Sequence, residues 1–360
     1  MKTLINLIGG QTIPNLIAQK FVEPQKIVLV FSKGSVKQKE NYKKISPEID
    51  FQEIEIEPYD YDTIANITSQ IVNNNATDEI ILNFTGGTKI MSLASFSVFS
   101  NKKLLSIYID SENGKIYKYK PGYTEIDDIN IKITLEEYLK LNGHIYQISD
   151  EKKVNDSRKK YYEYLENNYN IEISRFLDTI NKSFEANKQQ FYKSQFPIVS
   201  GKLKYSWDNL RNVSIIELNG HEFAIEGKDS IKYLTGLWFE DLVFYKKFYG
   251  TIYYDEILRN IHLQDKRGKQ DMIELDIVGL FKNNFHLFEL KSGKPRKEAL
   301  NNLTTIKEQL GTYTKLFLIS YFGIEENSTI VERMQDLQIT YYKYSDFVLE
   351  NCFESININL

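Results

Sequence analysis

The sequence predicts a two-domain α/β protein whose first domain contains a doubly wound, mainly parallel sheet. Over roughly the first 120 residues, short apolar runs rich in β-branched residues alternate with helical patterns, which is typical of strand–helix–strand units. This alternation stops near residue 146, where a polar, tyrosine-rich helical stretch begins, and new apolar runs follow it. The length of 360 residues is sufficient for two domains. We therefore expect a first domain at 1–145, a helical linker at 146–190 and a second α/β domain at 191–360.

Five buried strands are expected in the first domain. They are predicted at Leu4–Ile8, Lys26–Phe31, Phe51–Ile56, Glu79–Phe84 and Leu104–Ile109. Asn113–Gly114 is a hairpin turn signal after the fifth strand. Parallel sheets of this kind bind ligands beyond the carboxyl ends of their strands. The loops Gly9–Thr12 and Thr85–Lys89 follow the first and fourth strands, so both are expected at the ligand-binding edge.

The second domain is expected to be built around an apolar hairpin. Short strands with turns are predicted at 195–228, followed by an aromatic-rich helix at 233–248. The hairpin at 274–291 comes next, and a helix at 298–310 and a buried strand at 315–321 follow it. This succession predicts a mixed sheet flanked by helices.

The hairpin brings charged residues together. A two-residue turn at Asn283–Asn284 suits asparagine, which tolerates left-handed backbone. With that turn, Asp276 lies opposite Lys291 and Val278 lies opposite Glu289. Side chains alternate along a strand and opposed residues share a face, so Asp276, Glu289 and Lys291 are expected to converge.

Such a face is typical of metal-dependent phosphodiester cleavage. Two close carboxylates repel each other unless a cation neutralises them, and hard oxygen ligands favour Mg²⁺ or Mn²⁺. The expected metal ligands are Asp276, Glu289, the backbone carbonyl of Leu290 and Glu240 from the preceding helix. Lys291 is expected to position or deprotonate the attacking water and to stabilise charge on the phosphate. An acidic residue, an apolar hairpin and then Glu-Leu-Lys form the PD-(D/E)XK pattern.

Two alternatives remain open at the hairpin. Glu274 shares the strand face of Asp276 and is an alternative metal ligand. An ion-paired edge hairpin without catalysis would contain the same residue types.

Basic residues on both sides of the hairpin could hold phosphates. They are Lys266, Arg267, Lys269, Lys294, Arg296 and Lys297.

Composition narrows the class of protein. Lys and Arg number 45 against 49 Asp and Glu, giving a net charge of −4, so nucleic acid could bind only through local basic patches. The single cysteine, Cys352, excludes an internal disulfide framework and a cysteine-built zinc site. No segment is long and apolar enough to be read as a membrane span, and residues 1–8 lack the shape of a signal peptide. We expect a cytoplasmic protein.

The Thr85–Lys89 turn is a candidate anion site. It lacks the spacing of a P-loop. Its glycines can still let backbone N–H groups approach a phosphate at a helix N-terminus, where Lys89 would add positive charge. A simple tight turn is the alternative.

Two segments resemble the signature turns of CARF domains, the CRISPR-associated Rossmann-fold sensors. They are Leu4–Asn15, which contains Gly-Gly-Gln-Thr, and Asn83–Met91, which contains Thr-Gly-Gly-Thr-Lys. A CARF domain followed by a restriction-endonuclease-like PD-(D/E)XK domain resembles the cyclic-oligoadenylate-activated effector nucleases of type III CRISPR defence. The resemblance implies that the ligand contacts are Gly10, Gln11, Thr12, Thr85, Gly86, Gly87, Thr88 and Lys89.

The resemblance also implies how such a protein works. A homodimer would bind one cyclic oligoadenylate, with cyclic tetra-adenylate favoured, across its two-fold axis. Binding would activate metal-dependent cleavage of single-stranded DNA or RNA, or of duplex DNA. A transcriptional regulator with a CARF-type sensor and no catalysis is one alternative, and an unregulated restriction or repair endonuclease is another. Arg259-Asn-Ile-His262 has the wrong spacing for the HEPN ribonuclease motif that other CARF proteins carry.

Overall fold

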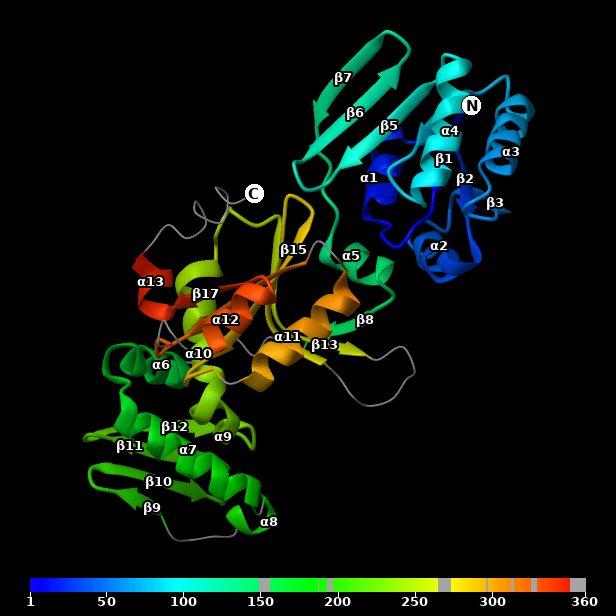
Figure 1. Ribbon diagram of the computed structural model, residues 1–360. Coiled ribbons are helices and arrows are strands. Elements are labelled where there is room, and N and C mark those ends of the chain that lie inside the picture. The colour runs from blue at the N-terminus through cyan, green and yellow to red at the C-terminus, as the bar shows by residue number, and fades with distance from the viewer. Residues whose placement is uncertain are drawn as a thin grey trace.

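The computed structural model describes residues 1–148, 156–186, 188–192, 197–264, 273–295, 297–311, 314–324 and 329–349. The described chain forms three sheets, and the first of them lies in a separate part of the molecule from the other two (Figure 1). The prediction of an α/β protein with an N-terminal, mainly parallel sheet is confirmed.

The first sheet has the order β3-β2-β1-β4-β5-β6-β7. Its strands are β1 (Lys2–Leu7), β2 (Lys26–Phe31), β3 (Asp50–Glu55), β4 (Glu79–Asn83), β5 (Leu105–Asp110), β6 (Lys115–Lys120) and β7 (Tyr123–Asp128). The first five strands are parallel, and β6 and β7 extend the sheet as an antiparallel meander. Strands β1, β2 and β4 are apolar and buried, as expected for strands that are covered on both faces.

Helices cover both faces of this sheet. Helices α1 (Ile13–Val22) and α2 (Val36–Lys43) contribute to one apolar core, and α3 (Tyr61–Asn74) and α4 (Lys89–Asn101) contribute to another. A short 3₁₀ turn, Lys33–Ser35, precedes α2. The amino ends of α1 and α4 follow directly after β1 and β4, so both point to the same edge of the sheet.

The second sheet has the order β17-β16-β15-β14-β13-β8. Its strands are β8 (Ile145–Ile148), β13 (Glu256–Gln264), β14 (Ile273–Phe281), β15 (Asn284–Lys291), β16 (Lys315–Ser320) and β17 (Ile339–Lys343). The helices associated with it are α11 (Lys297–Leu310), α12 (Thr329–Asp336) and α13 (Tyr344–Leu349). Strand β8 pairs with β13, so a segment that follows the first domain forms the edge of the second sheet.

A small antiparallel sheet adjoins the second sheet. It consists of β9 (Ile198–Ser200), β10 (Leu203–Asp208), β11 (Val213–Leu218) and β12 (His221–Glu226). The helices at this end of the molecule are α6 (Asp156–Asn168), α7 (Ile171–Ala186), α8 (Lys188–Phe191), α9 (Ser230–Lys232) and α10 (Trp238–Val243). Helices α6 and α7 share one apolar core with α10 and the small sheet. The described helices of the predicted linker therefore pack as part of the second half of the molecule.

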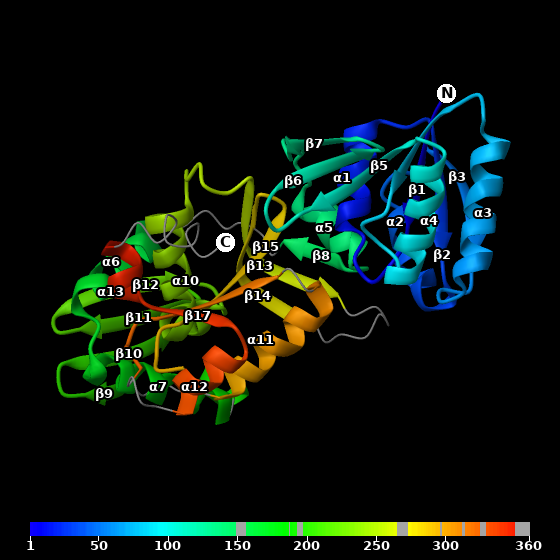
Figure 2. The same cartoon turned by 45° about the horizontal axis from the view of Figure 1, so that its top comes forward.

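The two halves share a continuous apolar core around α5 (Leu135–Leu141). The rings of Tyr138 in α5 and Phe285 in β15 stack with their centroids 4.9 Å apart. Figure 2 shows α5 and β8 beside β13 and β14, at the junction of the two halves. The first sheet and the sheet that contains the hairpin are thus joined by packing as well as by the chain.

The turn of the predicted hairpin lies one residue earlier than expected. Phe281 pairs with Asn284, and the two turn residues Lys282 and Asn283 have φ of 49° and 64°. Positive φ at both positions suits the two-residue turns whose twist matches a hairpin. The predicted pairing was therefore wrong by two residues, and Val278 lies opposite Leu287. A shift of two leaves every side chain on its predicted face, because the side-chain period is two.

None of the described helices has the length and apolar character needed to cross a lipid bilayer.

Candidate functional site

The carboxylate site lies where β14 and β15 stop pairing. Their ladder runs from Phe281–Asn284 to Ile277–Phe288. Beyond it, the Leu290 backbone N–H donates to Oδ2 of Asp276 over 2.7 Å. Asp276 is buried, and a side-chain hydrogen bond here replaces a backbone bond between the strands. Leu290, whose carbonyl is predicted to be a metal ligand, thus contacts Asp276 through its backbone N–H.

Glu289 and Lys291 form the second half of this site. Nζ of Lys291 lies 2.6 Å from Oε1 of Glu289. Burial alone would lower the pKa of Lys291, but the adjacent Glu289 and Asp276 carboxylates outweigh it and raise this pKa. Lys291 therefore stays positively charged across the physiological range, which suits a group that stabilises negative charge and does not suit a general base.

Helix α10 adds a third acid. Glu240 projects into the site from α10, and its Oε2 is buried without a hydrogen-bond partner among the described residues. Burial, and then the charges of Asp276 and Glu274, raise its pKa well above the ordinary value. A buried polar atom without a partner is costly, so it indicates an interaction that the protein atoms alone do not supply.

The pKa of Asp276 is raised for the same two reasons, burial and neighbouring negative charge. Burial and the neighbouring Glu289 raise its pKa to about 7, although Lys291 and the Leu290 N–H oppose the shift. Glu274, the alternative ligand, is exposed at the start of β14 and also raises the pKa of Asp276. The site therefore holds more negative charge than its single lysine balances.

The donor set fits a hard divalent cation. Asp276, Glu289 and Glu240 offer carboxylate oxygens, and Oε2 of Glu240 has no hydrogen-bond partner among the described residues. These are the ligand types that Mg²⁺ and Mn²⁺ prefer. In the described ranges, no three His, Cys, Asp or Glu side chains lie close enough together to hold a metal ion by themselves. A cation here would complete its coordination with the Leu290 carbonyl and water, as Mg²⁺ commonly does.

A buried ion pair next to Glu240 was not anticipated from the sequence. Asp241 on α10 and Arg259 on β13 are both buried and form an ion pair. Arg259 also donates to the Tyr245 hydroxyl over 3.2 Å and lies over the rings of Phe244 and Tyr245. Two π-helical turns, Tyr233–Leu237 and Phe244–Phe248, flank α10. The only hint in the sequence was an arginine amid apolar residues in a strand.

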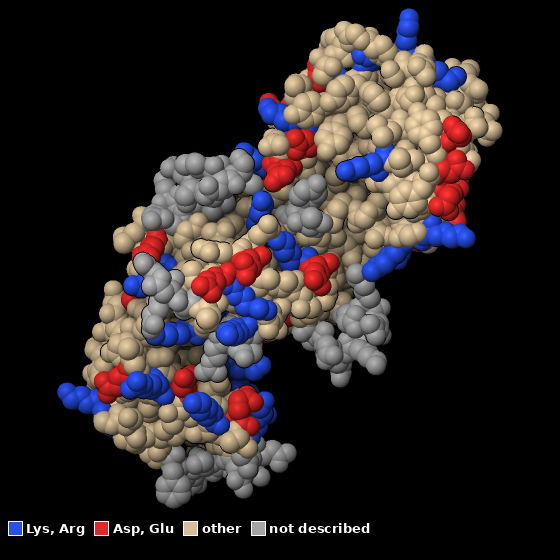
Figure 3. Space-filling model, in the orientation of Figure 1, with Lys and Arg blue, Asp and Glu red and all other residues tan. Residues whose placement is uncertain are grey.

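The basic flanks of the hairpin are only partly described. Lys266, Arg267, Lys269 and Arg296 lie outside the described residues. Lys294 and Lys297 are exposed just after β15. On the face drawn in Figure 3, Lys and Arg side chains are interspersed with Asp and Glu over the second half of the molecule. Any phosphate-binding surface on this face is local, in keeping with the net charge of −4.

In the first domain, the two predicted ligand loops touch each other. A Cβ at Gly9 would lie 2.8 Å from the Gly87 backbone nitrogen, and a Cβ at Gly86 would collide with the Leu7 carbonyl oxygen. Gly87 has φ of 77°, in the region that favours glycine. Only glycine allows this approach, which brings the amino ends of α1 and α4 together.

Threonine hydroxyls in the Thr85–Lys89 turn make internal bonds. The Thr85 hydroxyl accepts from the Ile109 N–H over 2.7 Å and bonds to the Asn83 side chain. The Thr88 hydroxyl accepts from the Met91 N–H and donates to the Pro58 carbonyl. These two side chains shape the turn, so backbone N–H groups and Lys89, which is exposed, remain as its means of contacting an anion.

Solvent exposure changes along the Gly9–Thr12 loop. Gly10 is exposed and has open space where a Cβ would project, whereas Thr12 is buried. The Gln11 amide lies against Gly311, directly after α11 in the second half of the molecule. Gln11 is therefore placed at the junction of the two halves as well as at the predicted ligand edge.

Comparison with known families supports this description. Residues 3–138 match the family described as the Card1 CARF domain. The first domain is a CARF domain. This confirms the identification that the signature turns suggested for this part of the chain. No protein of curated function matches the sequence.

Solved structures share the fold of nearly the whole chain. Can2 from Sulfobacillus thermosulfidooxidans, solved in complex with cyclic tetra-adenylate, has a TM-score of 0.73 and 19% identity over 95% of this chain and 95% of its own. Protein VC1899 from Vibrio cholerae has a TM-score of 0.77 and 15% identity over 99% and 97%. A type III CRISPR defence DNA nuclease activated by cyclic oligoadenylate reaches 0.50 and 12% over 92% of this chain and 51% of its own. At these identities the likeness concerns the fold alone.

Proposed function

We propose that the chain is a metal-dependent nuclease of type III CRISPR defence that a cyclic oligoadenylate activates through the CARF domain. The observation that carries the proposal is the cluster of Asp276, Glu240, Glu289 and Lys291, in which Lys291 pairs with Glu289 and the pKa values of Asp276 and Glu240 are raised. Perturbed pKa values of this kind are common at catalytic sites. Can2, solved with cyclic tetra-adenylate, supports the choice of activator.

In this proposal, Asp276, Glu289, Glu240 and the Leu290 carbonyl hold Mg²⁺ or Mn²⁺. The metal, when bound, supplies Lewis-acid stabilisation of phosphate charge and a more acidic water. Lys291 remains protonated, so it donates a hydrogen bond to the water or to a phosphate oxygen and balances the developing negative charge. A carboxylate of the cluster accepts the proton of the water.

The activator is proposed to lie on the joined amino ends of α1 and α4. Backbone N–H groups at two helix ends and the exposed Lys89 favour the phosphates of a cyclic oligoadenylate. Gly10 offers open space beside them. Gln11, Thr12 and the Thr85–Thr88 residues would line or shape the same edge.

A homodimer is part of the proposal. Each copy offers one ligand edge, and a ring with two-fold symmetry can contact two identical edges at once. An aromatic surface suits a second copy of the chain: Phe84, Phe96, Tyr108, Tyr117 and Tyr119 form a continuous set of ring contacts. Leu93 on α4 and Ile126 on β7 are 60% and 55% exposed. A two-fold axis near α4 would bring two ligand edges to one symmetric ring.

The test is a cleavage assay. Labelled single- and double-stranded DNA and RNA are incubated with Mg²⁺ or Mn²⁺ and with each cyclic oligoadenylate in turn. We expect cleavage only with metal and one of the rings, its loss in EDTA and its recovery with Mn²⁺. Calorimetry should give one ring per dimer.

The two alternatives predict other outcomes. A transcriptional regulator would bind a ring and cut nothing under any of these conditions. An unregulated restriction or repair endonuclease would cut equally well without a ring. Full activity after thorough chelation would refute the metal-dependent mechanism.

A further inference from the structure

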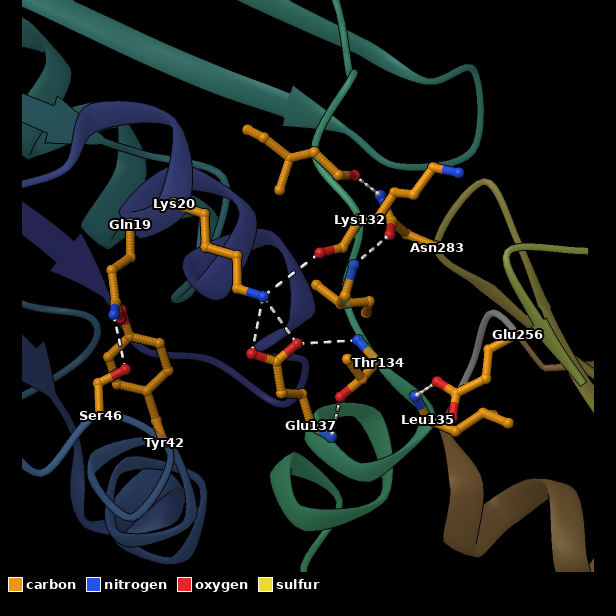
Figure 4. Close-up of polar contacts among 12 residues, drawn as sticks. Gln19, Lys20, Tyr42, Ser46, Lys132, Thr134, Leu135, Glu137, Glu256 and Asn283 are labelled. Carbon is orange, nitrogen blue, oxygen red and sulfur yellow. Dashed lines mark hydrogen bonds and ion pairs between the residues drawn. The ribbon is translucent and has the colours of Figure 1, made fainter. Parts of the chain in front are cut away.

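The hairpin of β14 and β15, which carries Asp276 and Glu289, is called the carboxylate hairpin below. Its turn is held by the end of the CARF domain. The Asn283 amide donates to the Ile131 carbonyl over 2.8 Å, and its Oδ1 accepts from the Ile133 N–H over 2.9 Å. Asn283 is only 5% exposed. One side chain thus satisfies both backbone groups on one edge of the segment that leaves the CARF sheet (Figure 4).

The next residue of the hairpin reaches a different part of the CARF domain. The Asn284 amide donates to the Ser111 carbonyl over 3.3 Å. Ser111 follows the end of β5, and two residues earlier the Ile109 N–H donates to the Thr85 hydroxyl. The predicted ligand turn and the carboxylate hairpin are therefore separated by a short stretch of β5 and two hydrogen bonds.

The segment from Lys132 to Glu137, which contains one of the contacts of Asn283, is held by residues on both sides. Nζ of Lys132 lies 2.7 Å from an Asp255 carboxylate oxygen, and the Leu135 N–H donates to Glu256 over 2.7 Å. On the other side, Lys20 at the end of α1 pairs with Glu137 over 2.7 Å, as Figure 4 shows. Helix α1 begins directly after the Gly9–Thr12 loop.

We propose that Asn283 is a positioning residue that clamps the carboxylate hairpin to segment 131–133 and so transmits the state of the CARF ligand edge to the nuclease site. Strands β14 and β15 are paired up to Ile277–Phe288, so a displacement of their turn is carried to Asp276 and Glu289 by the ladder. The nature of the signal rests on the proposed function. The clamp itself rests only on the contacts of Asn283.

The test variant is Asn283→Gly. Glycine accepts the φ of 64° at this position, so the turn keeps its shape while both side-chain hydrogen bonds are lost. The matched control is Asn219→Gly, in the exposed turn between β11 and β12, where Asn219 has φ of 54°. The two variants remove the same side chain from the same kind of turn.

Hydrogen–deuterium exchange of the full-length protein, without metal or ring, measures the clamp directly. We expect faster exchange at Ile133 and across residues 284–290 in Asn283→Gly, and wild-type exchange there in Asn219→Gly. The cleavage assay then measures transmission. In Asn283→Gly, stimulation by the ring should fall about tenfold, the scale of losing one or two buried hydrogen bonds, while calorimetry shows unchanged ring binding.

Unchanged exchange at Ile133 and at 284–290 would overturn the clamp. Full ring stimulation in Asn283→Gly, when exchange has increased, would overturn its role in transmission. Wild-type protein that cuts equally well without any ring would refute the proposed function, and the exchange comparison would still decide the clamp.

Discussion

In the CARF domain, the Thr85–Lys89 turn satisfies its own polar side chains, whereas the carboxylate site in the second half leaves its acids poorly satisfied. Thr85 and Thr88 direct their hydroxyls to backbone groups of neighbouring elements. By contrast, Asp276 is buried and Glu240 is half-buried, and both have raised pKa values. A surface that is rigid before binding loses little conformational freedom when a ligand arrives. A charged cluster is instead set up to gain free energy when a cation enters. This difference is the one that the proposed function requires, with recognition at the first site and chemistry at the second.

The largest expected effect is a loss of cleavage with no loss of ring binding, which would distinguish the carboxylate site from the ligand edge. Glu289→Gln keeps the side-chain size but removes a carboxylate, and we expect ring-stimulated cleavage to fall by about 10³-fold with ring affinity unchanged. Glu217→Gln is the matched control, because Glu217 also pairs with a lysine, Lys204, over 2.9 Å on a strand of the small sheet. Equal cleavage by the two variants would remove Glu289 from the site.

A second variant tests the support of α10. Arg259→Met leaves Asp241 buried without its cationic partner, so we expect a loss of about 3 kcal/mol in the free energy of unfolding. The double variant Asp241→Leu with Arg259→Met removes both charges and should recover most of this loss. Denaturant titration measures both. A double variant no more stable than Arg259→Met would contradict the pairing.

The pH dependence of stability tests the strain at Asp276. Its pKa is raised to about 7 in the folded protein, while an aspartate in an unfolded chain ionises near pH 4. Between about pH 4 and 7 the folded state therefore binds more protons, so the free energy of unfolding falls as pH rises, by at most about 1.4 kcal/mol per unit. Asp276→Asn should flatten this decline in metal-free protein. If the free energy of unfolding fell equally with pH in both proteins, the raised pKa of Asp276 would be contradicted.

The smallest expected effect concerns the ligand edge. Lys89→Ala removes the exposed charge, and Gly10→Trp fills open space without disturbing the fold. Each should weaken ring binding by about tenfold and raise the ring concentration needed for cleavage. Lys102→Ala, at the opposite end of α4, is the control. Calorimetry that shows unchanged affinity in both Lys89→Ala and Gly10→Trp would exclude this edge as the activator site.

Local patterns were sufficient to predict the parallel sheet. Strand β2 lies at its predicted bounds, Lys26–Phe31, and the other parallel strands begin and end within a few residues of theirs. Buried parallel strands are continuous apolar runs, which a sequence displays directly. The register of the hairpin was wrong because its turn is fixed by Asn283, whose partners Ile131 and Ile133 are about 150 residues away in the sequence. A contact of that kind leaves no local signal.

The same limit applies to the candidate site. Asp276, Glu289 and Lys291 could be brought together by strand alternation alone, since they belong to one hairpin. The Arg259–Asp241 pair joins a strand to a helix, and its burial follows from the packing of Phe244 and Tyr245 over the guanidinium. Neither the pair nor its burial could be inferred from spacing.

Strand β8 has a practical consequence for engineering. It follows the CARF domain in the chain, yet it forms the outer edge of the second sheet beside β13. A chimera cut after residue 148, to give the second half of the molecule a different first domain, would remove that edge strand and leave the backbone of β13 open to pairing with another chain. A cut between α5 and β8 would separate Tyr138 from Phe285. Exchange of the sensor should therefore be made between β7 and α5, with residues 129–134 chosen to keep the partners of Asn283.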